Sequence, residues 1–259
     1  MEFDLEASVH RLKRETLGDR VYEDIKGLLL SGQMPPGQRL TLRGLAKALG
    51  TSPMPIRDGV GRLVAERALE LLPNRSFAVP KLTRGQFREI VAIRCELEGL
   101  AAERAAGSMT ATQLAAIRSL AADFEAHGRG ERPDEVSAIK SNRKFHFAIY
   151  EAAAMPLLFD MIEKLWIQVG AFFALSMSNK IHKLSEIEAF QHHRDLVAAL
   201  ERQDGVSARQ AITSDIRDAA VRLLSHKIFA SHNDGIEEAA PDQLNPGLAP
   251  SMTGSPKNF

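Results

Sequence analysis

Two polar side chains that can bind a metal ion, Asn142 and His146, stand four residues apart in a segment with helical periodicity, 134–153. Residues four apart stack on one face of a helix, and this face also carries Ile139 and Ile149. The sequence therefore predicts that Asn142 and His146 point into a protein core, where an amide oxygen and an imidazole nitrogen are available as ligands.

Two further candidate ligands lie in later segments with the same periodicity. His193, in the predicted helix 184–202, shares its face with apolar residues, whereas His192 is turned about 100° away by the helical rotation. Asp215, in the predicted helix 206–229, lies at the edge of an apolar stripe, where a carboxylate without a partner would be costly. Two imidazoles, a carboxylate and an amide oxygen suit a divalent ion such as Zn, Ni or Mn and leave positions open for water or a ligand carboxylate. A buried hydrogen-bond network without metal is the alternative.

These side chains must be positioned by a helical bundle. From Thr83 to Phe229 the pattern is almost entirely helical, with few strand signals, and Arg94 brings a fixed positive charge to the apolar side of the first of these helices. The expected helices cover residues 83–106, 110–127, 134–153, 157–178, 184–202 and 206–229.

The preceding segment, 36–80, is organised differently. Thr41 is placed to cap a helix that runs through Ala48, and Ser52 is placed to cap a second helix, in which Pro53 occupies the first position. Pro55 leaves Ser52 only the amide of Met54 to cap. The apolar residues of the second helix face a core at helical spacing (Ile56, Val60, Leu63 and Val64).

The outward face of this second helix carries small or long polar groups, as a helix that enters the major groove requires: Met54, Asp58, Gly61 and Arg62, with Arg57 on the flank. Two short strands, 69–72 and 77–79, then form a hairpin whose Arg75 can reach phosphates or the minor groove. Helix, turn, helix and hairpin together predict a winged helix-turn-helix that binds DNA.

Charge favours DNA over the other interpretation, a helical packing module with an incidental hairpin. Residues 39–82 hold eight Lys or Arg and three Asp or Glu, in a chain whose net charge is zero. Double-stranded DNA would favour this local surplus, because neutralised phosphates release counterions.

The composition favours a protein of two domains. We expect it in the cytoplasm, at the nucleoid. The chain has 259 residues, of which 44% are apolar and 25% charged, which is ordinary for a soluble protein longer than one average domain. Cys95 is the single cysteine and cannot form an internal disulfide. The N-terminus lacks the pattern of a signal peptide. The longest apolar run, 165–177, is too short to span a bilayer.

The expected organisation is mainly α-helical and has four parts. A flexible arm, 1–14, precedes the winged helix-turn-helix, 15–80, whose first helix is expected over 18–30. The helical ligand-sensing and dimerisation domain covers 81–232. A disordered tail, 233–259, follows, because it holds several Gly and Pro residues and almost no large apolar ones.

The runs PGQRL, LRGLAKALGTS and PIRDGVGRLVAERALELLPNRSFAV resemble, almost without gaps, the N-terminal domain of GntR-type bacterial transcription regulators. The resemblance implies that five residues occupy the DNA-contacting positions of that family: Arg43, Ser52, Arg57, Asn74 and Arg75.

The chain departs from this family pattern at three positions in the second helix of the motif. Pro53 and Pro55 stand where members often carry Arg or Thr that touch bases or phosphates, and Gly59 replaces a common Ala. We therefore expect the base sequence that is read to be unusual.

Residues 84–226 resemble the all-helical ligand-sensing FCD domain of the FadR-type branch of the same family. The resemblance is carried by the runs RCELE at 94–98, NRKFH at 142–146 and HRDLVAAL at 193–200, and by the segment 211–216. Many members hold a metal with one Asp and three His. Here Asn142 stands at the position of the Asp and Asp215 at that of the last His, which implies weaker or altered metal binding, or none. Arg94 matches a position that helps to hold the carboxylate of a small organic acid.

The function implied is a ligand-responsive transcriptional regulator, not an enzyme. It would bind a near-palindromic operator as a homodimer formed by the helical domains, with two recognition helices in successive major grooves. A small carboxylate that contacts Arg94 and the His146/His193 centre would release it from DNA, as expected of a repressor.

Two other functions fit parts of the sequence. A metal-dependent hydrolase fused to a DNA-binding domain is possible in principle, because two His and one Asp can activate water. No nucleophile or general base with a distinctive motif accompanies them, however. The other alternative is a DNA-binding dimer without any effector.

Overall fold

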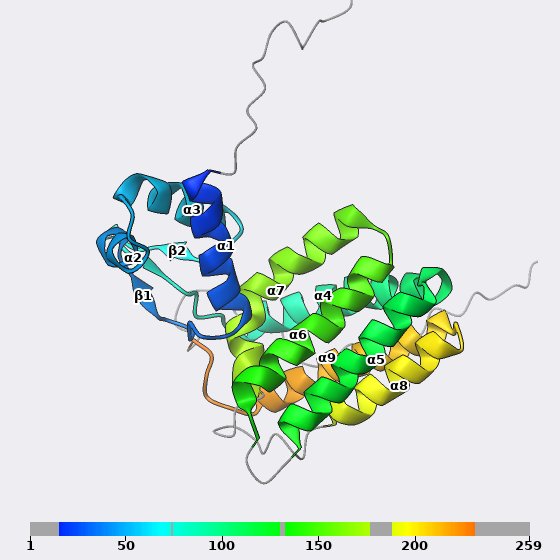
Figure 1. Cartoon of the computed structure of the whole chain (residues 1–259). Helices are drawn as coiled ribbons and strands as arrows, with labels where there is room; N and C mark the ends of the chain where they lie inside the picture. The colour runs from blue at the N-terminus through cyan, green and yellow to red at the C-terminus, as the bar shows by residue number, and fades with distance from the viewer. Residues whose placement is uncertain (1–15, 74, 130–132, 177–187, 231–259) are drawn as a thin grey trace, which may run out of the picture.

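The computed structural model describes residues 16–73, 75–129, 133–176 and 188–230, and in these ranges the chain is mostly α-helical (Figure 1). The first helices form one group at the N-terminal end, and the remaining helices form a bundle against it. The N-terminal group consists of α1 (Leu17–Leu30), α2 (Leu42–Ala48) and α3 (Pro53–Ala65). The bundle consists of α4 (Arg84–Ser108), α5 (Ala111–Gly128), α6 (Glu135–Ala152), α7 (Pro156–Ser176), α8 (Ala189–Glu201) and α9 (Gly205–Leu224).

Side-chain caps explain where several helices begin. Thr83 and Thr110 each form a capping box with the glutamine three residues later, which satisfies amides at the N-termini of α4 and α5. Asp134 and Asp204 accept hydrogen bonds from the third residue of α6 and α9. The expected cap at Thr41 is present as well, since its side chain accepts from the amide of Gly44.

The small sheet has one more strand than the sequence indicated. Strand β1 (Arg39–Leu40) pairs antiparallel with β3 (Phe77–Ala78), which pairs antiparallel with β2 (Glu70–Leu71), in the order β1-β3-β2. The two strands of the hairpin, β2 and β3, are also shorter than the expected 69–72 and 77–79. β1 has only two residues, too few for an alternating pattern to be visible in the sequence.

The last helix ends earlier than expected, at Leu224 instead of residue 229. Phe229 packs against Phe87 and Phe172, with ring centroids 5.0 and 5.5 Å apart, and the amide of Ala230 donates to the carbonyl of Leu82. The chain therefore leaves the helix to bring Phe229 into an aromatic cluster beside the link between the two groups of helices. The start of α8 is at Ala189, and residues 184–187 lie outside the described ranges, as do the expected arm 1–14 and tail 233–259.

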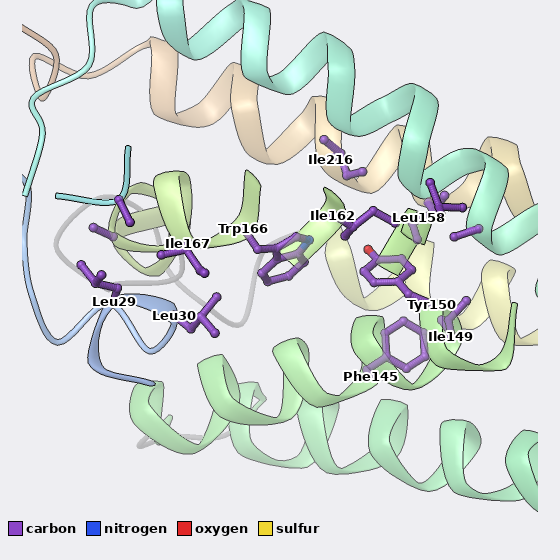
Figure 2. Packing of buried hydrophobic residues seen from close by; sticks show 14 of the residues in the cluster. Leu29, Leu30, Phe145, Ile149, Tyr150, Leu158, Ile162, Trp166, Ile167 and Ile216 are labelled. Carbon is purple, nitrogen blue, oxygen red and sulfur yellow. The ribbon is translucent and has the colours of Figure 1, made fainter. Parts of the chain in front are cut away.

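One hydrophobic core cluster runs from the N-terminal group into the bundle. Figure 2 shows Leu29 and Leu30 of α1 at one end of this cluster, Ile167 and Trp166 of α7 in the middle, and Tyr150 of α6 beyond them. The helix α7 therefore belongs to both parts of the molecule.

Two glycines allow α1 and α7 to approach closely. A Cβ atom at Gly170 would lie 2.6 Å from the carbonyl oxygen of Leu29, and one at Gly32 would lie 1.9 Å from the Cβ of Ala174. Lys26 of α1 also forms a salt bridge of 3.1 Å with Glu163 of α7. These contacts fix the N-terminal group on α7. Among the described helices, none has the length and apolar character needed to cross a membrane.

The close contact between α1 and α7 predicts a large cost for a single added methyl group. We expect Gly170→Ala to lower the free energy of unfolding by about 1–3 kcal/mol, because the new Cβ would force the α1 backbone away. Gly27→Ala on α1 is the matched control, since a Cβ there meets nothing within 4 Å and should be neutral or stabilising by up to about 1 kcal/mol. Urea denaturation followed by circular dichroism measures both. Equal stability of the two variants would contradict the tight α1–α7 contact.

Candidate DNA-binding surface and buried metal centre

The helix α3 begins without the side-chain cap expected from Ser52. Ser52 occupies the N-cap position, but its side chain makes no capping hydrogen bond. An N-cap oxygen accepts from the second or third helical amide, and the third residue here is Pro55, which has no N–H. The expectation that Ser52 caps the helix is therefore wrong, and its exposed hydroxyl is available for other contacts.

The basic residues expected to contact DNA are exposed on three elements of the N-terminal group. Arg57 on α3, Arg43 on α2 and Arg75 in the turn between β2 and β3 are all exposed. The backbone at Arg75 has a φ of 60°, in the left-handed region, as the tight turn before β3 requires. Asn74, the other residue expected in this turn, lies outside the described residues. The structure thus places each of the described candidates on the protein surface.

Two residues of α3 that the sequence associated with DNA reading instead hold α3 against α1. Arg62 forms a salt bridge of 2.6 Å with Asp19, and its guanidinium lies 3.9 Å from the centre of the Tyr22 ring. Gly59 is buried, and a Cβ there would lie 2.9 Å from the carbonyl oxygen of Gly18. The glycine at position 59 therefore serves helix packing, which corrects the expectation that it alters the base sequence that is read.

The interior of the bundle brings together His146 of α6, His193 of α8 and Asp215 of α9. One potential ligand atom from each lies within 4.8 Å of the others, and all three side chains are buried. The Oδ2 atom of Asp215 lies 3.2 Å from Nε2 of His146 and 3.9 Å from Nε2 of His193. Residues from three separate helices thus converge on one point with two imidazole nitrogens and a carboxylate.

His193 is buried among aromatic side chains. Its ring stacks on Phe145 and also contacts Phe124, with centroids 4.1 and 4.7 Å away. Burial lowers the pKa of His193 to about 3, so that the ring is neutral at neutral pH. Neither of its ring nitrogens has a hydrogen-bond partner among the described residues. A buried polar atom of this kind is costly unless a ligand satisfies it.

Asp215 is suited to share a cation with the two imidazoles. Burial raises the pKa of its carboxyl, the neighbouring His146 lowers it, and the net pKa is about 2. The group is therefore ionised at neutral pH. Two nitrogen donors and one carboxylate oxygen within coordination reach of one another fit a divalent ion such as Zn²⁺. Asn142, the fourth expected ligand, lies one helical turn before His146 and is half-buried.

The other side of His146 continues into a chain of buried polar groups. Its Nδ1 atom lies 3.1 Å from the hydroxyl of Tyr150, and this hydroxyl donates to Oε2 of Glu98. Burial and the nearby charge of Glu98 raise the pKa of Tyr150 well above its usual range, so that the phenol keeps its proton. Glu98 is in turn paired with Arg94, whose Nε lies 2.5 Å from Oε1.

Arg94 is thus already paired with a carboxylate of its own chain. Its side chain is 2% exposed and that of Glu98 is fully buried, and the guanidinium lies 4.7 Å from the centre of the Trp166 ring. An effector carboxylate that binds Arg94, as the sequence led us to expect, must therefore share or displace Glu98.

Glu98 and Tyr150 were missed when the sequence was read for functional residues. Each stands four residues after a residue that was singled out, Glu98 after Arg94 and Tyr150 after His146. This spacing places the two side chains of a pair on one helical face and was the available signal.

The buried centre is separate from the open groove of about 730 Å³ near α3. That groove is lined by residues of α3, β2, α4 and α7 and of the segments between α3 and α4, such as Leu69, Ile90 and Leu165, and by none of the candidate metal ligands. At the enclosed centre both ring nitrogens of His193 are buried without a hydrogen-bond partner among the described residues, and such atoms call for a ligand.

Two family models match the chain. Residues 17–79 match the gntR family of bacterial regulatory proteins, and residues 89–218, half of the chain, match the FCD domain. The chain belongs to the GntR family. Its helix-turn-helix domain is followed by an FCD effector-binding domain, which confirms the winged helix-turn-helix and helical bundle predicted from the sequence.

Relatives of known sequence and structure agree with this assignment. The chain is 33% identical to the HTH-type transcriptional regulator McbR of Escherichia coli (strain K12), over 78% of this chain and 90% of that protein. It is 29% identical to a probable D-xylose utilization operon transcriptional repressor of Paenarthrobacter nicotinovorans, over 82% and 91% of the two chains. The solved structure of E. coli McbR/YncC has a TM-score of 0.76 and 31% identity, and the match covers 82% of this chain and 99% of that one.

A more distant structure shares the fold alone. A putative GntR regulator from Rhodococcus sp. RHA1 has a TM-score of 0.65 at 18% identity, with 80% of this chain and 97% of that chain covered. Family membership makes the chain a DNA-binding transcriptional regulator and not an enzyme, which argues against the hydrolase alternative.

Breaking the buried ion pair of Arg94 and Glu98 should cost much more stability than breaking an ion pair on the surface. With a chelator present, Glu98→Gln should lower the free energy of unfolding by about 3–5 kcal/mol, because it leaves a buried guanidinium without its counter-charge. Glu201→Gln, which breaks the exposed pair with Arg118, should cost at most about 1 kcal/mol. Chemical denaturation measures both, and similar small costs would show that the Arg94–Glu98 pair does not need its charge balance.

Proposed function

We propose that the protein is a repressor that binds a near-palindromic operator as a homodimer and is released by a small organic acid. The exposure of Arg57 on α3, of Arg43 on α2 and of Arg75 in the turn between β2 and β3 is the observation that carries this proposal. The family assignment supports it, and so does the repressor named among the relatives. Such a protein acts on chromosomal DNA and hence in the cytoplasm, at the nucleoid.

The proposed DNA contacts come from three elements of the N-terminal group. Arg57 and Ser52 are placed at the start of the recognition helix α3, where a helix in the major groove touches base edges. Arg43 on α2 would bind the phosphate backbone, and Arg75 with Asn74 in the wing would reach phosphates or the minor groove. The surplus of basic residues in 39–82 supports binding to a polyanion.

A homodimer formed by the helical domains would present two copies of α3. Two recognition helices about one helical turn apart read two half-sites of opposite direction, which is why the operator should be near-palindromic.

The proposed effector site is the buried centre of the bundle. His146, His193 and Asp215 would hold a divalent ion, with Asn142 as a fourth ligand. A divalent ion bound there supplies a Lewis acid that accepts a carboxylate oxygen. Arg94, one turn before Glu98 on α4, would bind the other end of a small acid or its second carboxylate.

The burial of this centre gives the effector a physical means to change DNA binding. His146 and His193 are each 2% exposed, so that a ligand reaches them only if packed helices move. An effector changes DNA affinity only to the extent that it binds two arrangements of the dimer differently, typically by about 1–3 kcal/mol. Since α7 contacts both the centre and α1, it would carry such a movement to the DNA-binding group.

The recognition-helix assignment predicts that Arg57→Ala weakens specific operator binding at least tenfold, since one good base contact discriminates by about 1–3 kcal/mol. Arg118→Ala on α5, far from this surface, is the matched control and should bind the operator normally. Fluorescence anisotropy at moderate salt measures affinity, and circular dichroism should show unchanged helix content. Normal operator affinity of the Arg57 variant would overturn the assignment.

The effector proposal is tested by thermal shift against a panel of small organic acids, with and without added divalent ions. We expect one or more acids to raise the melting temperature of the wild type, since a ligand that binds only the folded state stabilises it. His146→Ala combined with His193→Ala should remove any divalent ion that co-purifies and weaken this response.

The outcomes of this panel separate the two parts of the proposal. If elemental analysis finds no metal in carefully prepared wild type, the proposed metal ion is refuted, but the proposed response to an organic acid is not. No stabilisation by any acid, in either condition, would favour a DNA-binding dimer without an effector.

A further inference from the structure

We propose that Tyr150 and Glu98 are positioning residues that fix the tautomer of His146, so that its Nε2 atom presents a lone pair to the metal. This inference rests on the proposed metal centre and adds two residues, outside the ligand set, that prepare one of its ligands. It follows from counting the hydrogens along the buried polar chain from Arg94 to Asp215.

The count begins at Glu98, which has only acceptors to offer. Its Oε1 accepts from Nε of Arg94 at 2.5 Å, and its Oε2 accepts from a terminal nitrogen of the same guanidinium at 3.3 Å. A guanidinium keeps its charge and all its hydrogens in a protein, so that Arg94 can only donate. The direction of every hydrogen bond that follows is set from this fixed end.

The hydrogen bond from Tyr150 to Glu98 determines which hydrogen bond Tyr150 can make with His146. A phenol has one hydrogen, and that of Tyr150 is donated to Oε2 of Glu98. The Tyr150 oxygen can therefore only accept from Nδ1 of His146, which lies 3.1 Å away. Nδ1 must carry a hydrogen for this contact to be a hydrogen bond.

A hydrogen on Nδ1 leaves Nε2 as the bare nitrogen of a neutral imidazole. Nε2 lies 3.2 Å from Oδ2 of Asp215, a carboxylate oxygen that also presents lone pairs. Two acceptors at this separation repel each other in a buried site unless a cation lies between them. A divalent metal ion held by His146 and Asp215 would satisfy this requirement.

The chain therefore links the two ends of the proposed effector site. Arg94 is at one end and the metal ligand His146 at the other, with Glu98 and Tyr150 between them, and all four side chains are buried. Groups that hydrogen-bond to a metal-bound histidine orient its ring and raise its basicity, and their loss typically weakens metal binding by about 10- to 100-fold.

The test uses Tyr150→Phe, which removes one oxygen atom and keeps the ring. Tyr22→Phe is the matched control, because Tyr22 also donates to a glutamate, Glu66, at 2.8 Å, but in the DNA-binding group. The affinity of chelator-treated protein for Zn²⁺ is measured by competition with a chromophoric chelator. We expect Tyr150→Phe to raise the Kd for Zn²⁺ about 10- to 100-fold and Tyr22→Phe to leave it within about twofold.

A second measurement separates positioning from a general structural role. In metal-free wild type, ¹⁵N resonances of the histidine side chains report which ring nitrogen carries hydrogen, and the resonances lost in His146→Gln identify His146. We expect a protonated Nδ1 in the wild type and a shift of the hydrogen from Nδ1 toward Nε2 in Tyr150→Phe.

The outcomes distinguish this inference from the proposed metal site. An unprotonated Nδ1 in the wild type overturns the inference, and so does an unchanged Zn²⁺ affinity in folded Tyr150→Phe when the wild type binds zinc. If the wild type binds no zinc, the proposed metal centre fails, and the protonation of Nδ1 alone decides whether Tyr150 and Glu98 fix the tautomer.

Discussion

The buried ion pair between Arg94 and Glu98 is the constraint on which the inside of the bundle depends. A charge in the interior of a protein is tolerated only when it is paired and hydrogen-bonded, and here the pairing propagates through Tyr150 to His146. Each step uses up the hydrogens of one group and so dictates what the next group can do. The chain ends where His146, His193 and Asp215 bring two imidazoles and a carboxylate within 4.8 Å of one another. These three residues could hold a metal ion, and the proposed function places a divalent cation there.

The position of α7 connects this point with DNA binding. Trp166 lies against both Arg94 and His146. The centre of its ring is 4.7 Å from the guanidinium of Arg94 and 5.4 Å from the centre of the His146 ring. One turn further along α7, Gly170 lies against the backbone of α1. The core is close-packed and continuous across this helix (Figure 2). Under the proposed function, a change at the centre that moves Trp166 would therefore also shift the packing of α7 against the DNA-binding group. A regulator needs such a connection between effector and DNA.

Much of this arrangement could be predicted from the sequence, for identifiable physical reasons. Helical spacing of apolar residues located the helices, and the same spacing placed His146 and His193 on inward faces. What could not be predicted depends on contacts between elements distant in the sequence. The role of Gly59 depends on the approach of α1, that of Arg62 on Asp19 and Tyr22, and the early end of α9 on the aromatic partners of Phe229. Ser52 makes no capping hydrogen bond, and Pro55, visible in the sequence, removes the third amide that such a bond could use.

Diffraction from crystals grown with Zn²⁺, recorded at the zinc absorption edge, tests most directly whether the buried chain ends on a cation. The account predicts an anomalous peak inside the bundle, at about 2.0–2.2 Å from Nε2 of His146, a nitrogen of His193 and an oxygen of Asp215. No anomalous peak there, together with a direct hydrogen bond from His146 to Asp215, would contradict it.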